Sequence, residues 1–266
     1  MSSQISTSQM LMEVCYIIGF TILGMALGSF FNVCIDRLPR EESIVNPPSH
    51  CEACHHRLGA KDLIPIFSYL WLKGRCRYCQ EPIPRRLLLV ELATAAIFPL
   101  LYLSYGLTSE FGVLAFYVCL FLIVFVIDME RRLILNRVVY PGMALALLIA
   151  GVTPQQWLLE WGQPGIISSL VGGGIGFAIF LLIAIISRGG MGWGDVKLCA
   201  LIGLAVGFPL VFIALLIGIV LGGVVALALL VSKRKGRREA IPFGPFLSLG
   251  AVITLIWWGQ LLGYFV

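Results

Sequence analysis

Long apolar runs separated by short polar stretches dominate this sequence. A membrane-spanning helix needs about 20 predominantly apolar residues, and runs of this kind recur along the chain. They predict spanning helices at about 11–33, 87–105, 111–128, 136–152, 165–187, 196–208, 209–231 and 243–264. The expected fold class is therefore an all-α polytopic membrane protein with about eight transmembrane helices.

The count of eight depends on one division. The sixth and seventh helices share an apolar block, which we divide at Gly207-Phe208-Pro209 because glycine and proline interrupt helices. Without that break the count is seven. The first apolar run has no basic residue before it and is long enough to span, so it is predicted to be a retained helix and not a cleaved signal.

Basic residues are segregated along the chain. All 19 Lys and Arg residues lie in the segments 37–86, 131–137, 188–197 and 233–238. With eight helices these are alternate loops, and the loops between them carry Glu110 and Glu160 but no basic residue. Since cytoplasmic loops hold the excess of Lys and Arg, the four segments are predicted to be cytoplasmic and both termini to lie outside.

Composition supports a membrane protein and argues against a nucleic-acid partner. The chain is 59% hydrophobic and 12% charged, whereas soluble domains carry about 25% charged residues. Its net charge of +5 is explained by membrane orientation. The basic segment Lys233–Arg238 is predicted to anchor the topology and to attract anionic lipid.

The first cytoplasmic segment, about residues 36–86, contains two matched CxxC pairs, Cys51-Glu-Ala-Cys54 and Cys76-Arg-Tyr-Cys79. Two thiolates from each of two tight turns form a closed tetrahedral site, which predicts a structural zinc. Rubredoxin-like iron is the main competitor. A disulfide or a redox CxxC is disfavoured by a reducing cytoplasm. The nearby His50, His55 and His56 are predicted to lie at the surface, since four cysteines already complete the site.

The chemistry is expected to depend on carboxylates. All three histidines lie within residues 50–56, which argues against a Ser-His or Cys-His hydrolase in the membrane, and no HExxH motif is present. Asp128 and Asp195 both stand at helix ends on the predicted cytoplasmic side. Two carboxylates brought together share a proton, so one can activate a water while the other polarises a peptide carbonyl.

Each aspartate also has a structural interpretation, as a helix cap or as a partner of Arg131, Arg132 or Lys197. The segment around Asp195 favours catalysis, because Gly192 and Gly194 leave the backbone open to another chain. Gly192, Gly194 and Lys197 are therefore the predicted substrate-binding residues.

Two further motifs lie inside apolar helices. Glu91 is interpreted as a member of a polar network or as a functional acid, since a membrane carboxylate is costly. The glycine-rich stretch Gly172–Gly176 is interpreted as a helix-packing surface and not as a nucleotide loop, because no soluble strand precedes it.

Taken together, the motifs resemble those of the bacterial type IV prepilin peptidases, which are bifunctional leader peptidases and N-methyltransferases. Besides the paired CxxC motifs, the stretches that carry the resemblance are Gly28-Ser-Phe-Phe-Asn-Val-Cys-Ile-Asp-Arg-Leu-Pro39, Pro82-Ile-Pro-Arg-Arg86, Val90-Glu-Leu92, Ile127-Asp128, Leu133-Ile-Leu-Asn136, Gly192-Trp-Gly-Asp-Val-Lys-Leu198 and Pro242-Phe-Gly-Pro-Phe246. One departure is Asn136, where many members have an aspartate.

The resemblance implies an aspartyl protease dyad of Asp128 and Asp195 at the cytoplasmic face of the bacterial inner membrane. The implied substrates are prepilins or pseudopilins, cut after a glycine and then methylated at the new N-terminus from S-adenosylmethionine. The implied domains are a first helix at 1–35, a small cytoplasmic zinc-binding loop domain at 36–86 and a catalytic bundle at 87–266.

Three other functions stay open at this point. A GxGD protease of the presenilin or signal-peptide-peptidase type would cut inside substrate helices, but the cysteine pairs argue against it. A proton-coupled transporter would use the aspartates as a relay, although no internal repeat is visible. A non-catalytic assembly scaffold is the third.

Overall fold

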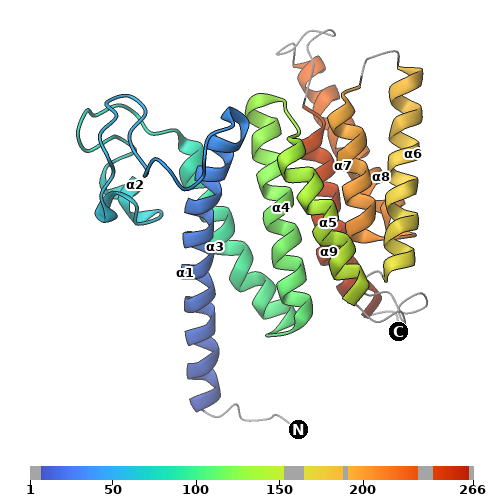
Figure 1. Ribbon diagram of the computed structural model, residues 1–266. Coiled ribbons are helices and arrows are strands. Elements are labelled where there is room, and N and C mark those ends of the chain that lie inside the picture. The colour runs from blue at the N-terminus through green and yellow to red at the C-terminus, as the bar shows by residue number, and fades with distance from the viewer. Residues whose placement is uncertain (1–6, 153–164, 188–190, 233–241, 264–266) are drawn as a thin grey trace. The chain divides into compact units, whose positions relative to one another are not determined.

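The structure is a computed structural model that describes residues 7–152, 165–187, 191–232 and 242–263 (Figure 1). Within these residues the chain is almost entirely helical. The long helices are α1 (Thr7–Arg37), α3 (Arg85–Tyr105), α4 (Ser109–Arg131), α5 (Asn136–Val152), α6 (Ile166–Ile186), α7 (Trp193–Val206), α8 (Leu210–Val231) and α9 (Gly244–Gly263). Between α1 and α3 lie three short elements, the 3-10 turns η1 (Leu38–Arg40) and η2 (Ala60–Asp62) and the helix α2 (Phe67–Trp71).

Each of the eight predicted helices is present within a few residues of its expected bounds. The predicted break at Gly207–Pro209 between the sixth and seventh spanning helices is confirmed, because α7 ends at Val206 and α8 begins at Leu210. Gly207 ends α7 with a φ of 71°, which glycine adopts at little cost. Five of the helices, α1, α3, α4, α6 and α8, are long and apolar enough to cross a membrane.

The chain divides into two compact units, Met1–Ala115 and Phe116–Val266. This boundary falls within α4. The predicted three-part division at residues 35 and 86 concerns topology and stays a prediction.

In the first unit, α1 packs along α3, and the two lie side by side in Figure 1. Small residues permit this close approach. A Cβ at Gly24 would meet the backbone carbonyl of Thr94, and one at Gly28 would lie 2.8 Å from the Cα of Glu91. Gly28, the first residue of the Gly28–Pro39 stretch, therefore has a packing role between α1 and α3.

Polar side chains join the same two helices at the loop end. The Asn32 amide donates to the Leu87 carbonyl at 3.0 Å. One turn further along α1, Asp36 pairs with Arg86 at 2.6 Å. These contacts fix the point at which both helices meet the cysteine-containing loop.

In the second unit, α7 is the central helix and contacts α5, α6, α8 and α9. Ten of its 14 residues are buried, as expected of a helix that is apolar on every side. The glycine-rich stretch of α6 packs against it: a Cβ at Gly172 would lie 2.5 Å from the Gly203 carbonyl oxygen, and one at Gly173 would lie 2.7 Å from Leu204. The packing interpretation of this stretch is confirmed.

Candidate active site and metal site

Asp128 lies in the last turn of α4 and is 5% exposed. Its carboxylate accepts a hydrogen bond from the backbone N–H of Gly244, the first residue of α9. The start of a helix presents unpaired N–H groups and a partial positive charge. Asp128 is therefore oriented by the N-terminus of a helix far from it in sequence.

Asp195 also lies at a helix N-terminus, in this case that of its own helix. It is the third residue of α7, and its carboxylate accepts a hydrogen bond from the backbone N–H of Gly192, the N-cap. This is the acidic half of a capping box. The helix thus begins at Trp193, earlier than expected, and includes both Gly194 and Asp195.

Ile134, in the link between α4 and α5, packs between the helix starts that hold the two acids. A Cβ at Gly194 would lie 2.8 Å from the Cβ of Ile134. One at Gly244 would lie 3.3 Å from the Ile134 Cδ1 and 2.7 Å from Oδ2 of Asp128. The space over Gly194 is therefore filled by this chain's own isoleucine, and Gly244 must lack a side chain for Asp128 to stay in place.

The two carboxyl groups are close enough for Asp128 to act electrostatically on Asp195. In the part of the chain that the structure describes, neither acid forms an ion pair with Arg131, Arg132 or Lys197. Two partly desolvated acids without a cationic partner can hold a proton between them. Such a pair can supply a general base and a general acid at one point.

Lys197 contacts α5. Its Nζ donates to the Asn136 side-chain oxygen at 2.9 Å and lies 5.3 Å from the centre of the Tyr140 ring. Asn136 therefore has a defined role as the acceptor for this lysine. The substrate contacts expected of Gly192, Gly194 and Lys197 stay predictions.

The four loop cysteines come together as one cluster. The sulfur atoms of Cys51, Cys54, Cys76 and Cys79 all lie within 4.8 Å of one another. No histidine belongs to a metal-type cluster within the described residues. The His56 ring instead packs on Tyr78 at 3.7 Å between ring centroids. The donor set therefore fits a tetrahedral thiolate-bound metal, and four sulfurs leave no open position.

The two CxxC turns have the same backbone geometry. The Cys51 N–H donates to the His56 carbonyl and the Cys76 N–H to the Glu81 carbonyl, at 3.0 and 2.8 Å. His55 and Gln80, each four residues after the first cysteine of its turn, both have positive φ. The N–H of His55 donates to the Cys51 carbonyl, and the N–H of Gln80 donates to the Cys76 carbonyl. Two independent turns shaped alike support a common ligand.

Backbone N–H groups prepare one sulfur for metal binding. Those of Cys79 and Tyr78 lower the pKa of the Cys76 thiol to about 7. The Glu81 N–H lowers the pKa of the Cys79 thiol. Desolvation and hydrogen bonds with the other three thiols together outweigh this effect, so the pKa of Cys79 is raised to about 12. Four sulfurs this close cannot all ionise alone, so the loss of their protons would require a bound cation.

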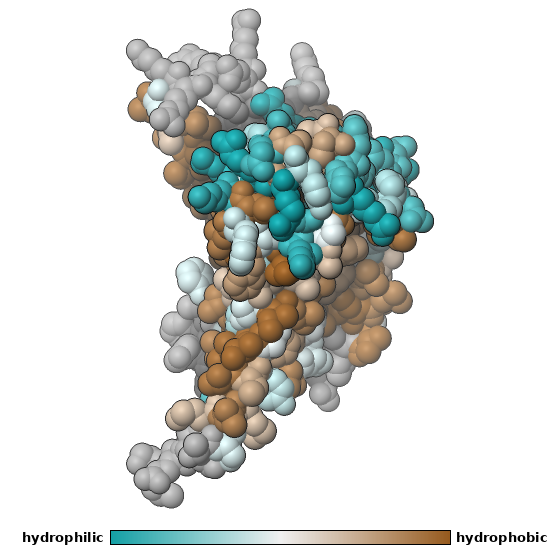
Figure 2. Space-filling model, turned by 90° about the vertical axis from the view of Figure 1, so that its left-hand side faces the viewer, coloured by the Kyte–Doolittle hydropathy of each residue, from teal (hydrophilic) through white to brown (hydrophobic). Residues whose placement is uncertain are grey.

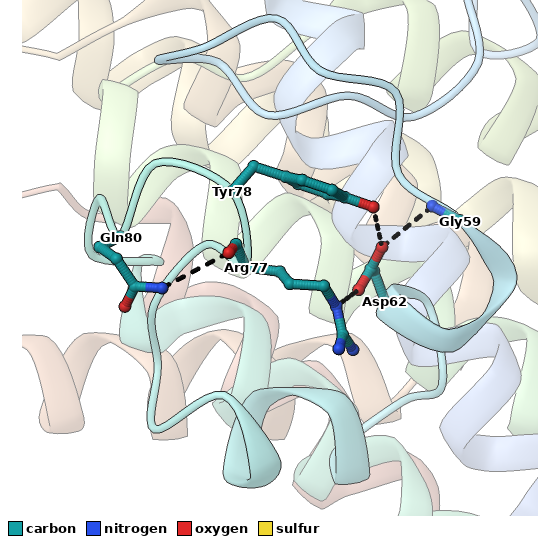
Figure 3. Close-up of polar contacts among 5 residues, drawn as sticks. All are labelled: Gly59, Asp62, Arg77, Tyr78 and Gln80. Atoms are coloured by element: carbon teal, nitrogen blue, oxygen red, sulfur yellow. Dashed lines mark hydrogen bonds and ion pairs between the residues drawn. The ribbon is translucent and has the colours of Figure 1, made fainter.

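Asp62 braces the second turn (Figure 3). It accepts hydrogen bonds from the Gly59 N–H at 3.1 Å, Arg77 Nε at 2.6 Å and the Tyr78 hydroxyl at 3.3 Å. The pKa of Asp62 is lowered, and the largest cause is its hydrogen bond from Arg77. Because Arg77 and Tyr78 are the two residues between Cys76 and Cys79, this carboxylate fixes the orientation of both ligands.

We expect Asp62→Ala to speed the release of metal to a chelator about tenfold, as loss of outer contacts to metal ligands usually does. The measurement is absorbance of a chromogenic chelator over time. Glu42→Gln is the matched control, because Glu42 is an exposed acid of the same loop outside both CxxC turns. Equal release rates from the two variants would contradict the role of Asp62.

Sequence reasoning did not single out Gly244, Ile134 or Asp62. The first two lie inside quoted motifs, Pro242–Phe246 and Leu133–Asn136, so the signal was present without a role attached to it. For Asp62 no local pattern marks its partners. The predicted basic segment Lys233–Arg238 lies outside the described residues.

Comparison with known proteins places these features in context. Residues 22–105 match the bacterial peptidase A24 N-terminal domain, and residues 114–227 match the type IV leader peptidase family. The chain is 30% identical to a prepilin leader peptidase/N-methyltransferase of Bacillus subtilis, across 92% of this chain and 96% of that protein. It is 31% identical to one from Pseudomonas putida, across 92% of each. No solved structure matches the chain.

Proposed function

Because the chain belongs to the type IV leader peptidase family, we propose that it removes the leader peptides of type IV prepilins or pseudopilins and N-methylates the residue thereby exposed. The single observation that supports the protease activity most strongly is the pair of neighbouring acids, Asp128 and Asp195, each held at a helix N-terminus.

We assign Asp128 and Asp195 the roles of a shared-proton dyad. The ionised carboxylate takes a proton from a water molecule, whose oxygen attacks the carbonyl carbon of the scissile peptide. The protonated carboxyl donates a hydrogen bond to the carbonyl oxygen and then passes its proton to the leaving amine. The peptide bond breaks, and the products are a leader with a new carboxylate and a chain with a new amino group.

The charge pattern supports placing this reaction at the cytoplasmic face. Both acids adjoin segments that carry Lys and Arg, which the positive-inside rule assigns to the cytoplasm. A basic leader followed by an apolar helix would present its junction at that surface. The host membrane in this proposal is the bacterial inner membrane.

We propose zinc as the metal held by Cys51, Cys54, Cys76 and Cys79. Its role when bound is structural, since four thiolates complete its coordination. Between residues 41 and 84 only Gly74 and Cys76 are buried, so the loop has no apolar core of its own to hold it together. The chain's own contribution is the two matched turns and the Asp62 brace.

We propose S-adenosylmethionine as the methyl donor, on the strength of the methyltransferase names of the relatives. It supplies an electrophilic methyl group to the free amine of the product. We assign none of this chain's residues to its binding.

We expect metal-ligand variants to separate the two activities. In Cys54→Ser or Cys79→Ser, cleavage should persist in part while methylation falls more, because the dyad lies on other elements and needs no metal. Mass spectrometry of the product distinguishes the outcomes by the mass of one methyl group. A parallel loss of both activities in a folded variant would show that the loop belongs to the protease site.

Gly244→Ala tests the geometry of the dyad. The added Cβ would lie 2.7 Å from Oδ2 of Asp128 and force the carboxylate aside. We expect leader cleavage to fall by about 10- to 100-fold, since displacement of a catalytic group by about 1 Å has costs of that order. Gly223→Ala is the matched control, because nothing lies within 4 Å of a Cβ there.

The decisive experiment is incubation of the purified protein with a prepilin, followed by mass spectrometry. We expect a product shortened at the glycine of the leader junction. A presenilin-type protease would cut within the apolar helix, whereas a transporter or a scaffold would leave the substrate intact.

A further inference from the structure

The segment Leu63–Trp71, between the two CxxC turns, exposes an unusual amount of apolar surface. Its exposed large side chains are Leu63 (41%), Ile64 (48%), Phe67 (61%), Leu70 (59%) and Trp71 (84%). The rest of the loop is mainly polar. Figure 2, which faces this side of the chain, shows a hydrophilic surface over the loop interrupted by hydrophobic side chains. Five large apolar side chains exposed within nine residues indicate a contact with another phase or partner.

A buried acid ties this segment to a membrane helix. The Ile66 N–H donates to Oε2 of Glu91 at 2.7 Å, and Glu91, which is 8% exposed, also accepts a hydrogen bond from the Ser29 side chain. Ile66 is the N-cap of α2. The start of α2 is therefore held against both α1 and α3 at the level of Glu91.

Glu91 and Ser29 lie deeper in the apolar part of the two helices than the charged residues at the loop end. At 1.5 Å per residue, Glu91 is about 7 Å along α3 from Arg86, and Ser29 is about 10 Å along α1 from Asp36. Arg86 and Asp36 form the ion pair at the loop end of the helices, where charged groups belong with the lipid headgroups. Since the headgroup zone is about 5–8 Å thick on each side, this distance would place Ile66 at the boundary between headgroups and acyl chains.

The local backbone is held in an unusual shape at the same place. Ile66 has φ 63° and ψ −54°, and the Phe67 N–H donates to the Pro65 carbonyl at 2.6 Å. This is a γ-turn of the rare, strained kind, and a β-branched residue is an outlier there. The Glu91 bond stabilises that turn and so fixes where α2 begins.

We propose that Leu63–Trp71 is an interfacial membrane segment, in which α2 lies in the bilayer surface with Phe67, Leu70 and Trp71 among the lipids and Glu91 as its anchor. Tryptophan is enriched at this depth, and Lys73 and Arg75 follow at once on the exposed side, where they meet anionic headgroups. The segment would tether the cysteine loop to the membrane surface. The inference does not depend on the proposed function.

The test measures the depth of Trp71 in the bilayer by quenching of its fluorescence. The full chain, with its other five tryptophans replaced by phenylalanine, is reconstituted into vesicles that contain lipids brominated near the top or near the end of the acyl chain. Since tryptophan at an interface lies at headgroup level, we expect shallow bromines to quench Trp71 strongly, deep bromines to quench it less, and aqueous acrylamide to have little effect. Glu81→Trp, in a second variant in which Trp71 is also replaced by phenylalanine, introduces a tryptophan at an exposed position. Its fluorescence should respond only to acrylamide.

Acrylamide quenching of Trp71 equal to that at position 81 would overturn the proposal. Relief of bromine quenching upon addition of a prepilin would also overturn it, because a prepilin would then cover the segment Leu63–Trp71. Relief at higher protein density would do the same, because a second copy of this chain would then cover it. Glu91→Leu should shift the Trp71 emission to longer wavelength, whereas Glu91→Gln, which retains an acceptor oxygen, should not.

Hydrogen exchange of the unmodified chain in lipid nanodiscs provides a second test, independent of the tryptophan replacements. The amides of residues 63–72 should exchange more slowly in nanodiscs of phosphatidylcholine and phosphatidylglycerol than in the Glu91→Leu variant. Equal and rapid exchange in both proteins would overturn the proposal.

Discussion

Asp128→Asn and Asp195→Asn are each expected to lower leader cleavage at least about 10³-fold, the scale on which loss of one member of a catalytic unit acts. Asparagine keeps the shape of each side chain and can still accept the N–H of Gly244 or Gly192. It can neither take a proton from water nor donate one to the leaving amine. The measurement is the rate of prepilin shortening at saturating substrate.

The control for this pair is Glu130→Gln, which removes an exposed acid two residues from Asp128 on the same helix. It should cleave at the normal rate. Because residues of one catalytic unit are not additive, the double variant should be no slower than the slower single one. Full activity in either single variant would remove that residue from the dyad.

Replacing Cys51 and Cys76 together by serine is expected to abolish metal binding. The unaltered protein should carry about one zinc per chain, because four thiolates form one closed site. Loss of the metal should also disorder the loop, since between residues 41 and 84 only Gly74 and Cys76 are buried. The measurements are elemental analysis of a preparation purified without added metal and proteolysis of the loop.

Cys15→Ser provides the matched control, because Cys15 is an exposed cysteine of α1 outside the cluster. Its metal content should be unchanged. Iron in the unaltered protein would identify a rubredoxin-like site instead. A normal zinc content in the double serine variant would contradict the assignment of these ligands.

The sequence by itself determined the helices and the chemical groups. Apolar runs and the Gly207–Pro209 break are local signals, and hydrocarbon leaves the backbone few alternatives to a helix. The paired cysteines likewise predicted their own cluster, because two short turns with identical spacing present equivalent ligands. Asp128 and Asp195 stood out because isolated acids at the ends of apolar runs are costly.

Tertiary structure decided what surrounds those groups. That the Gly244 N–H reaches Asp128, or that Ile134 fills the space over Gly194, depends on how α4, α7 and α9 pack, which no local pattern encodes. Glu91 shows the same division: its place in an apolar helix predicted that it needs a partner. The identity of that partner, the Ile66 N–H of a distant turn, follows only from the fold, because desolvation of an acid demands a hydrogen bond without specifying which residue supplies it.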